Sequence, residues 1–348
     1  MLILLSGSGV NSEPGETREP EGGETEETAE STCEKGIGNM SVVGAAGRLG
    51  LPGISSWGYQ LQGRNGQAIS IVDVMGYEFY LMVLDNSADG TEDKEFSRAD
   101  IEGVKATGKI VLAYMSIGEA EDYRFYWDWM PKSLIIEENP DWPGNYKVKY
   151  WTRTWKNILF SRTSGPRKSY LDRIIDQGFD GVYLDIVDAY EFAGPHEIGG
   201  TDRRRTAAAD MIRLVGEIAD HARITRGRPD FCIVPQNAVC IWDQENFPDD
   251  PDPEGKSRQM RQRYLADIDA IGVEDVFFFG PRNENNPYRP DQWVINHLTS
   301  YQEVGKLILS VEYVTWKKKV KKYYQAASQN GYVPLATRRA LNGVFFRP

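Results

Sequence analysis

From about residue 50 onward, short apolar runs alternate with longer segments whose apolar residues recur with helical period. The short runs are rich in β-branched and aromatic residues, which favours β-strands. They cover residues 54–62, 77–85, 109–118, 181–187, 231–237, 270–279, 306–314 and 331–338. Short strands that alternate with helices are typical of βα units and a parallel sheet.

Helices are predicted in most of the gaps between these runs. Residues 97–108 begin with a serine suited to an N-cap and end on glycine, and residues 166–178 also end on glycine. In residues 206–227 apolar side chains gather on one helical face. Further helices are predicted at residues 258–269, 291–305 and 317–331.

Eight strand–helix units in roughly 300 residues predict a (β/α)8 TIM barrel of the α/β class. A doubly wound open sheet is the structural alternative, but no GxGxxG fingerprint follows the first strand. Residues 119–165, after the third strand, are too long for a simple connection. This insertion is a natural place for substrate contacts. Most of its tryptophans are nevertheless expected to pack it against the barrel; they are Trp127, Trp129, Trp142, Trp151 and Trp155.

The chain is expected to begin with a segment outside the folded body. Residues 11–34 hold nine glutamates and one arginine, a net charge of −8 out of −11 for the whole chain. Residues 11–40 have almost no large apolar side chains, which predicts disorder. The apolar run at residues 2–5 is too short to span a membrane and resembles the end of a secretion signal. Residues 1–45 are therefore predicted to be a signal remnant and a disordered acidic linker, residues 50–348 one folded domain, and the protein extracellular or secreted.

Several classes of chemistry lack their sequence signatures. The cysteines Cys33, Cys232 and Cys240 form no CxxC pair, and the three histidines form no HExxH motif. Neither a GxSxG elbow nor a P-loop occurs. No basic cluster suggests a nucleic-acid partner. No cofactor and no stable membrane insertion are expected, and the sequence predicts no particular oligomeric state.

Acidic and polar side chains stand at the carboxyl ends of the predicted strands. In a barrel these ends converge on the face where active sites form. Acids gathered there repel one another and cost stability when partly buried, so their concentration indicates catalysis or cation binding. The strand-end residues are Tyr59, Asp85, Glu119 with Glu121, Asp185 with Asp188, Gln236 with Asn237, Glu274 with Asp275, and Glu312 with Tyr313.

Three chemistries could use such a site. A zinc site would want histidine ligands, which are in the wrong places, whereas an all-oxygen magnesium or calcium site is an open alternative. A Schiff-base enzyme needs a strand-end lysine, and none is present. Glycoside hydrolysis needs two carboxylates that flank the scissile bond, together with side chains that hold sugar rings. It ranks first because aromatic and amide candidates for sugar binding are present: Trp57, Tyr59, Tyr114, Tyr183, Gln236, Asn237 and Tyr313.

Six stretches carry a resemblance to a known family. They are "LAYMSIGEAEDYRFYW", "ENPDWPGNYKVKYW", "GFDGVYLDIVDAYEF", "VPQNA", "AIGVEDVFF" and "GYVPLATR", and they span about residues 54–340. In this order they resemble glycoside hydrolase family 114, the endo-α-1,4-polygalactosaminidase group. The sequence departs from the family in "VLDNS", where relatives often have Asp-Tyr-Ser, and at Glu312, where many have aspartate.

The resemblance implies a (β/α)8 glycoside hydrolase that cleaves a partly deacetylated, galactosamine-containing polysaccharide. It also implies that Asp185 and Glu274 are the catalytic pair. The bowl of acids fits this substrate, because galactosamine with a free amine is cationic near neutral pH. Asp188 is expected either to face the site or to cap a helix, Glu119 to contact substrate from a loop, and Asp85 and Glu312 to line the bowl. The rival hypotheses are a barrel that binds an aminosugar polymer without cleaving it, and a divalent-metal-dependent barrel enzyme.

Overall fold

The structure is a computed structural model that describes residue 51 and residues 53–193 and 204–348. The predicted signal remnant and acidic linker lie outside the described residues. No helix in the described ranges combines the length and the apolar character that crossing a membrane requires.

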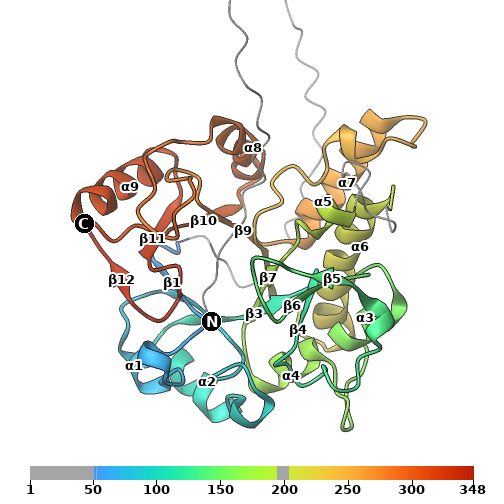
Figure 1. Ribbon diagram of the computed structural model, residues 1–348, viewed down its shortest axis with the longest axis horizontal. Helices are drawn as coiled ribbons and strands as arrows, with labels where there is room; N and C mark the ends of the chain where they lie inside the picture. The colour runs from blue at the N-terminus through green and yellow to red at the C-terminus, as the bar shows by residue number, and fades with distance from the viewer. Residues whose placement is uncertain (1–50, 52, 194–203) are drawn as a thin grey trace, which may run out of the picture.

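Eight parallel strands form the centre of the molecule, and each lies within one of the eight predicted runs (Figure 1). The first five pair in the order β1-β2-β3-β7-β8, and β9, β10 and β11 pair in sequence. The strands are β1 (Trp57–Gln60), β2 (Leu81–Leu84), β3 (Ile110–Ser116), β7 (Gly181–Asp185), β8 (Cys232–Pro235), β9 (Ala270–Glu274), β10 (Leu307–Glu312) and β11 (Val333–Thr337). A short strand, β12 (Phe345–Phe346), pairs antiparallel with β11.

Hydrogen bonds close the two sheets into a barrel. The backbone N–H of Asn237 donates to Gly272 at 2.8 Å, and that of Asp269 donates to Ile233 at 2.9 Å, which joins β8 to β9. On the other side, the indole of Trp57 on β1 donates to a β11 carbonyl at 3.0 Å. The strand order and this closure confirm the predicted TIM barrel.

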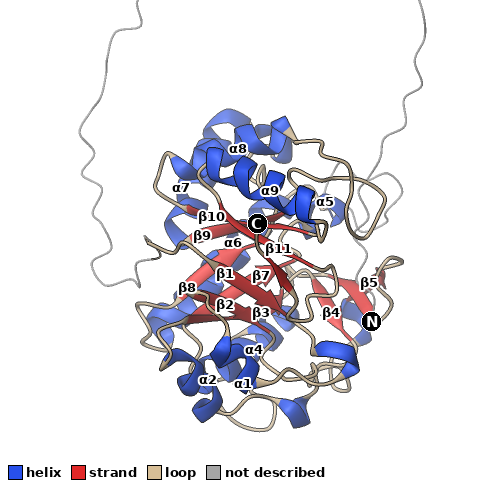
Figure 2. Ribbon diagram, turned by 90° about the vertical axis from the view of Figure 1, so that its left-hand side faces the viewer, coloured by secondary structure: helices blue, strands red, loops and turns tan. Residues whose placement is uncertain are grey.

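Helices cover the barrel on both sides of the strands (Figure 2). The six predicted helices are all present as α2, α4, α6, α7, α8 and α9, whereas α1, α3 and α5 were not predicted because they are too short to show a period. Their bounds are α1 (Ile71–Gly76), α2 (Arg98–Lys105), α3 (Arg153–Leu159), α4 (Tyr170–Gln177), α5 (Ala189–Ala193), α6 (Ala207–Asp220), α7 (Pro253–Asp267), α8 (Gln292–Gln302) and α9 (Lys317–Gln329). Ser97 caps α2 in a capping box with Asp100, and Gly178 ends α4 with a φ of 92°.

Aromatic side chains fill the barrel interior beneath the strand ends. The rings of Trp57, Tyr59 and Tyr183 lie with centroids 5.1–6.1 Å apart, and all three side chains are buried. Gly272 on β9 makes room for them, since a Cβ there would lie 1.9 Å from the Tyr183 hydroxyl. Trp57 and Tyr183 had been predicted to contact substrate. They instead form the floor on which the site rests.

The long insertion folds into a three-stranded antiparallel sheet that sequence periodicity did not reveal. It is ordered β4-β6-β5, with β4 (Glu119–Glu121), β6 (Asn145–Val148) and β5 (Ile135–Glu138). Trp155, in the helix that follows, is fully buried and donates its indole N–H to the carbonyl of Ile117 at 2.9 Å. This tryptophan packs the insertion against the barrel, as expected.

A buried arginine fastens the insertion to the barrel. The Arg124 side chain is 2% exposed, and its guanidinium forms two 2.8 Å bonds to the carboxylate of Asp85, just past β2. It also donates to Glu121 of β4 at 2.7 Å. Asp85 had been predicted to line the substrate bowl. It is buried as the partner of Arg124, because an unpaired carboxylate at this depth would be strongly destabilising.

Replacing Arg124 is expected to destabilise the protein strongly. Arg124→Met leaves Asp85 and Glu121 buried without a cation, so we expect the free energy of unfolding to fall by about 3–5 kcal/mol. Urea denaturation at pH 7 measures this loss. Arg98→Met is the matched control, since its ion pair with Glu102 is exposed and is worth only about 0.5 kcal/mol. Equal losses in the two variants would contradict the role given to Arg124.

Candidate active site

A cavity of about 740 Å³ opens at the carboxyl ends of the barrel strands. Nine of the predicted site residues line it: Tyr59, Tyr114, Glu119, Asp185, Asp188, Gln236, Asn237, Glu274 and Tyr313. Two further acids, Asp141 and Glu191, and the tryptophan Trp142 of the insertion also line it. Lys147 is the single basic side chain among the described residues of its wall. The cavity is therefore strongly acidic.

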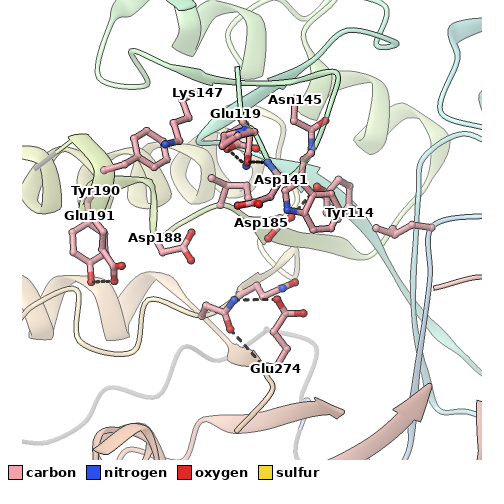
Figure 3. A pocket seen from close by; sticks show the side chains of 18 of the residues that line it. Tyr114, Glu119, Asp141, Asn145, Lys147, Asp185, Asp188, Tyr190, Glu191 and Glu274 are labelled. Atoms are coloured by element: carbon pink, nitrogen blue, oxygen red, sulfur yellow. Dashed lines mark hydrogen bonds between the residues drawn. The ribbon is translucent and has the colours of Figure 1, made fainter. Parts of the chain in front are cut away.

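Asp185 ends β7 and projects into this cavity (Figure 3). Its carboxylate accepts a 2.8 Å hydrogen bond from the hydroxyl of Tyr114 on β3. Burial, and next the charge of Glu274, raise the pKa of Asp185 to about 7. A carboxyl group with this pKa exchanges its proton near neutral pH, which suits general acid–base catalysis.

Glu274 ends β9 and lines the same cavity as Asp185. The hydroxyl of Tyr313 donates to one of its carboxylate oxygens, and the Asn237 amide donates to the other at 3.5 Å. The Asn237 side chain also accepts from the backbone N–H of Glu274 at 3.3 Å. Neighbouring strands thus fix the Glu274 side chain, with Asn237 following β8 and Tyr313 following β10. In Figure 3, Asp185, Asp188 and Glu274 surround one space.

Asp188 faces the cavity, which is one of its two predicted placements. Burial and then the carboxylates of Glu191, Asp185 and Glu274 raise its pKa well above its ordinary value. No base pairs with its side chain within the described part of the chain, so it adds to the acidity of the site. Its backbone carbonyl accepts a hydrogen bond from Glu191 at 2.8 Å as the chain enters α5.

Glu119 is not the loop residue that the sequence predicted. It begins β4, is buried, and presents its carboxyl group to the cavity. One oxygen accepts from the Asn139 side chain at 2.9 Å, while the other is buried with no partner among the described residues. Burial raises the pKa of Glu119 to about 7, and the hydrogen bond from Asn139 and the charge of Lys147 oppose that rise. Because buried polar atoms normally have a hydrogen-bond partner, this oxygen at the cavity wall is suited to accept a hydrogen bond from a bound ligand.

Glu312 lies outside the cavity, contrary to the prediction that it lines a subsite. It is fully buried at the end of β10 and accepts a 2.6 Å hydrogen bond from the backbone N–H of Phe277. Burial, and next the charge of Asp275, raise its pKa well above the ordinary value. It therefore supports the chain that follows β9 from the interior of the barrel.

Sequence reasoning missed Arg339, which supports the other side of the site. It follows β11, is buried, and forms a 2.7 Å ion pair with Asp275. Its guanidinium lies 3.6 Å from the ring centroid of Tyr313, whose hydroxyl donates to Glu274. Its position just past a strand end was the signal that could have found it, but no residue at the end of the eighth predicted strand was considered.

The backbone is strained where the chain leaves β7, β8 and β9. Ile186, Asn237, Ala238 and Asp275 follow these strand ends with φ values between 54° and 58°. For a β-branched residue such as Ile186 this left-handed conformation is a genuine outlier. Each such residue costs about 1–3 kcal/mol and persists only where its surroundings enforce it, as they often do at functional sites.

The acids of the cavity do not form a metal centre. No cluster of three or more histidine, cysteine, aspartate or glutamate side chains with the geometry to hold a metal ion occurs in residues 51, 53–193 and 204–348. What the arrangement offers is two carboxylates from separate strands, each held by a tyrosine, in one acidic cavity. Glycoside hydrolysis requires such a pair of carboxyl groups.

Comparison with known proteins identifies the family. The family model of glycoside-hydrolase family GH114 matches residues 42–248, more than half of the chain. The chain belongs to GH114. An uncharacterized protein of Thermotoga maritima is 36% identical over 299 residues, covering 82% of this chain and 81% of its own length. Another, from Methanocaldococcus jannaschii, is 36% identical over 293 residues, covering 81% of this chain and 75% of its own length.

Two solved structures share the fold. Ega3 of Aspergillus fumigatus, in complex with galactosamine, superposes with a TM-score of 0.58 at 18% identity, covering 84% of this chain and 95% of that one. The glycoside hydrolase domain of PelA from Pseudomonas aeruginosa gives a TM-score of 0.57 at 17% identity, covering 84% and 98%. As a member of GH114, the protein is a glycoside hydrolase, and its barrel is the one predicted from the sequence.

Two substitutions are expected to move the pKa of Asp185 in opposite directions. Tyr114→Phe removes a hydrogen bond that stabilises the charged carboxylate, so the pKa should rise above about 7. Glu119→Gln removes a nearby negative charge, so the pKa should fall below about 7. Titration by 13C NMR of protein labelled at aspartate carboxyl carbons measures both shifts.

Asp275 serves as the internal control for this titration. Its pKa of about 6 is set by burial, Arg339 and Glu274, so neither substitution should move it. Shifts of the same sign in both variants, or an Asp185 that titrates near 4 in the wild type, would contradict this account of the site.

Proposed function

We propose that this GH114 protein cleaves α-1,4-galactosaminidic bonds in a partly deacetylated aminosugar polysaccharide. The observation that carries the proposal is the pairing of Asp185 and Glu274 in one acidic cavity, each with a tyrosine hydroxyl donated to it. One of the two protonates the glycosidic oxygen as its bond to the anomeric carbon breaks. The other attacks that carbon or activates the attacking water.

The charge of the cavity supports an amino sugar as substrate. Among the described residues, its wall is lined by six acidic side chains and one lysine. The ammonium group of that lysine, Lys147, already forms a 2.7 Å ion pair with Glu137. A cavity lined with one sign of charge focuses its field and concentrates ligands of the opposite sign. Galactosamine carries an ammonium group near neutral pH, whereas an N-acetylated or unmodified sugar does not. The galactosamine bound to the fold neighbour Ega3 agrees with this choice.

Neighbouring side chains have clear parts in the same reaction. The Glu119 carboxyl group, with one oxygen lacking a partner among the described residues, is placed to accept from the substrate ammonium or a hydroxyl group. The Gln236 amide, which accepts a 3.3 Å bond from Tyr59, and the Asn237 amide suit sugar hydroxyls. Asp188 places a further carboxyl group in the same cavity.

Amide substitution of either paired acid is expected to abolish cleavage. On partly deacetylated α-1,4-galactosaminan, Asp185→Asn and Glu274→Gln should each lower the rate of reducing-end release at least about 100-fold, because each removes a proton carrier or nucleophile. Glu312→Gln is the matched control. It makes the same change at a strand end outside the cavity, and it should keep wild-type activity.

Measurements of polymer binding distinguish hydrolysis from the alternative function, a barrel that binds the polymer without cleaving it. Tight binding of the polymer by wild type and both amide variants, with no release by any, would establish binding without cleavage. Equal cleavage of the fully N-acetylated polymer would refute the role given to the acidic cavity in selecting an amine.

Activity is expected to survive chelation. Because the described acids form no metal cluster and the proposed chemistry needs only carboxyl groups, EDTA treatment followed by desalting should leave the rate of reducing-end release unchanged. Loss of activity that added Mg²⁺ or Ca²⁺ restores would instead support the metal-dependent alternative.

A further inference from the structure

A second cavity of about 340 Å³ adjoins the first. The two share Asp188, Glu191, Asn237, Cys240 and Glu274 in their walls, so Glu274 stands at the junction of a continuous cleft. We call the first the acidic compartment and the second the aromatic compartment. The aromatic compartment is lined by the chain that follows β9 and by the start of α8.

Outside the shared residues, the two compartments differ in charge. The aromatic compartment adds two acids, Asp275 and Asp291, and two arginines, Arg282 and Arg339, so these formal charges cancel. Asp275 and Arg339 are already paired at 2.7 Å. The outer end of the cleft therefore lacks the excess of negative charge that would attract an ammonium group.

Two aromatic side chains are exposed in this compartment. Phe279 is 47% exposed and Trp293 is 53% exposed, although most large apolar side chains of the described residues are buried. The Trp293 ring is held by His297 one helical turn later, with ring centroids 4.1 Å apart. Exposed aromatic rings fixed in a cavity typically contact the apolar face of a ligand.

We propose that the aromatic compartment binds an N-acetylated galactosamine residue while the acidic compartment binds a deacetylated one. The acetamido group is neutral, its methyl group packs on an aromatic ring, and its C=O and N–H need one donor and one acceptor. Arg282 and Asp291 are of these two types and line the same wall. The enzyme thus cuts preferentially between a galactosamine and an N-acetylgalactosamine. This inference rests on the proposed function.

Product sequencing tests this preference. A randomly half-acetylated α-1,4-galactosaminan is digested in H₂¹⁸O, which marks each new reducing end, and the products are sequenced by mass spectrometry. On one side of the cut we expect galactosamine, and on the other N-acetylgalactosamine well above its share in the polymer. Trp293→Ala and Phe279→Ala should weaken this enrichment. Each should also lower kcat/KM on the half-acetylated polymer by about tenfold, a larger loss than on the fully deacetylated polymer.

Trp316→Ala is the matched control, because Trp316 is 57% exposed and lines neither compartment. It should leave both the rate and the enrichment unchanged. Cleavage by the wild type with both sides of the cut at the polymer's average composition would overturn this inference and leave the proposed function standing. Equal losses on the two polymers in Trp293→Ala would also overturn it. Cleavage of neither polymer would overturn the proposed function itself.

Discussion

Two buried arginines neutralise three of the acids at the mouth of the barrel. Arg124 takes up the carboxylates of Asp85 and Glu121, and Arg339 takes up that of Asp275. Without these cations, three more carboxylates would lie close to a site that is already acidic, at a separation and burial where repulsion is strong. The insertion, the strand ends and the active site can share one region only because these pairs neutralise the surplus charge.

The same arginines also support the tyrosines that donate to Asp185 and Glu274. The Arg124 guanidinium lies 5.9 Å from the ring centroid of Tyr114, which donates to Asp185, and that of Arg339 lies 3.6 Å from Tyr313. A cation over an aromatic ring is attracted to its face and fixes its position. The two sides of the site therefore repeat one arrangement, in which an arginine steadies a tyrosine and the tyrosine orients a carboxylate. This organises the site before any ligand arrives.

Local sequence signals predicted the barrel and placed Asp185 and Glu274 among the polar residues at its strand ends, whereas the family resemblance singled them out as a pair. A position at a strand end also led to the selection of Asp85 and Glu312, but in the structure neither side chain lines the cavity. Their partners, Arg124 and the backbone N–H of Phe277, come from other segments of the chain. Such long-range contacts cannot be read from the local pattern of a single sequence. The sheet formed by β4, β5 and β6 escaped prediction because its short strands show no clear alternation of apolar and polar residues.

The cavity acids that have no arginine partner carry a stability cost. Asp185 and Glu119 have pKa values of about 7, above those of an unfolded chain, so they favour the folded state at low pH and lose that contribution as the pH rises through 7. The strained backbone after β7, β8 and β9 adds to this cost. A bound ammonium group would relieve the repulsion directly. The empty site is thus less stable at neutral pH than at low pH, and under the proposed function the binding of a cationic sugar offsets part of that cost.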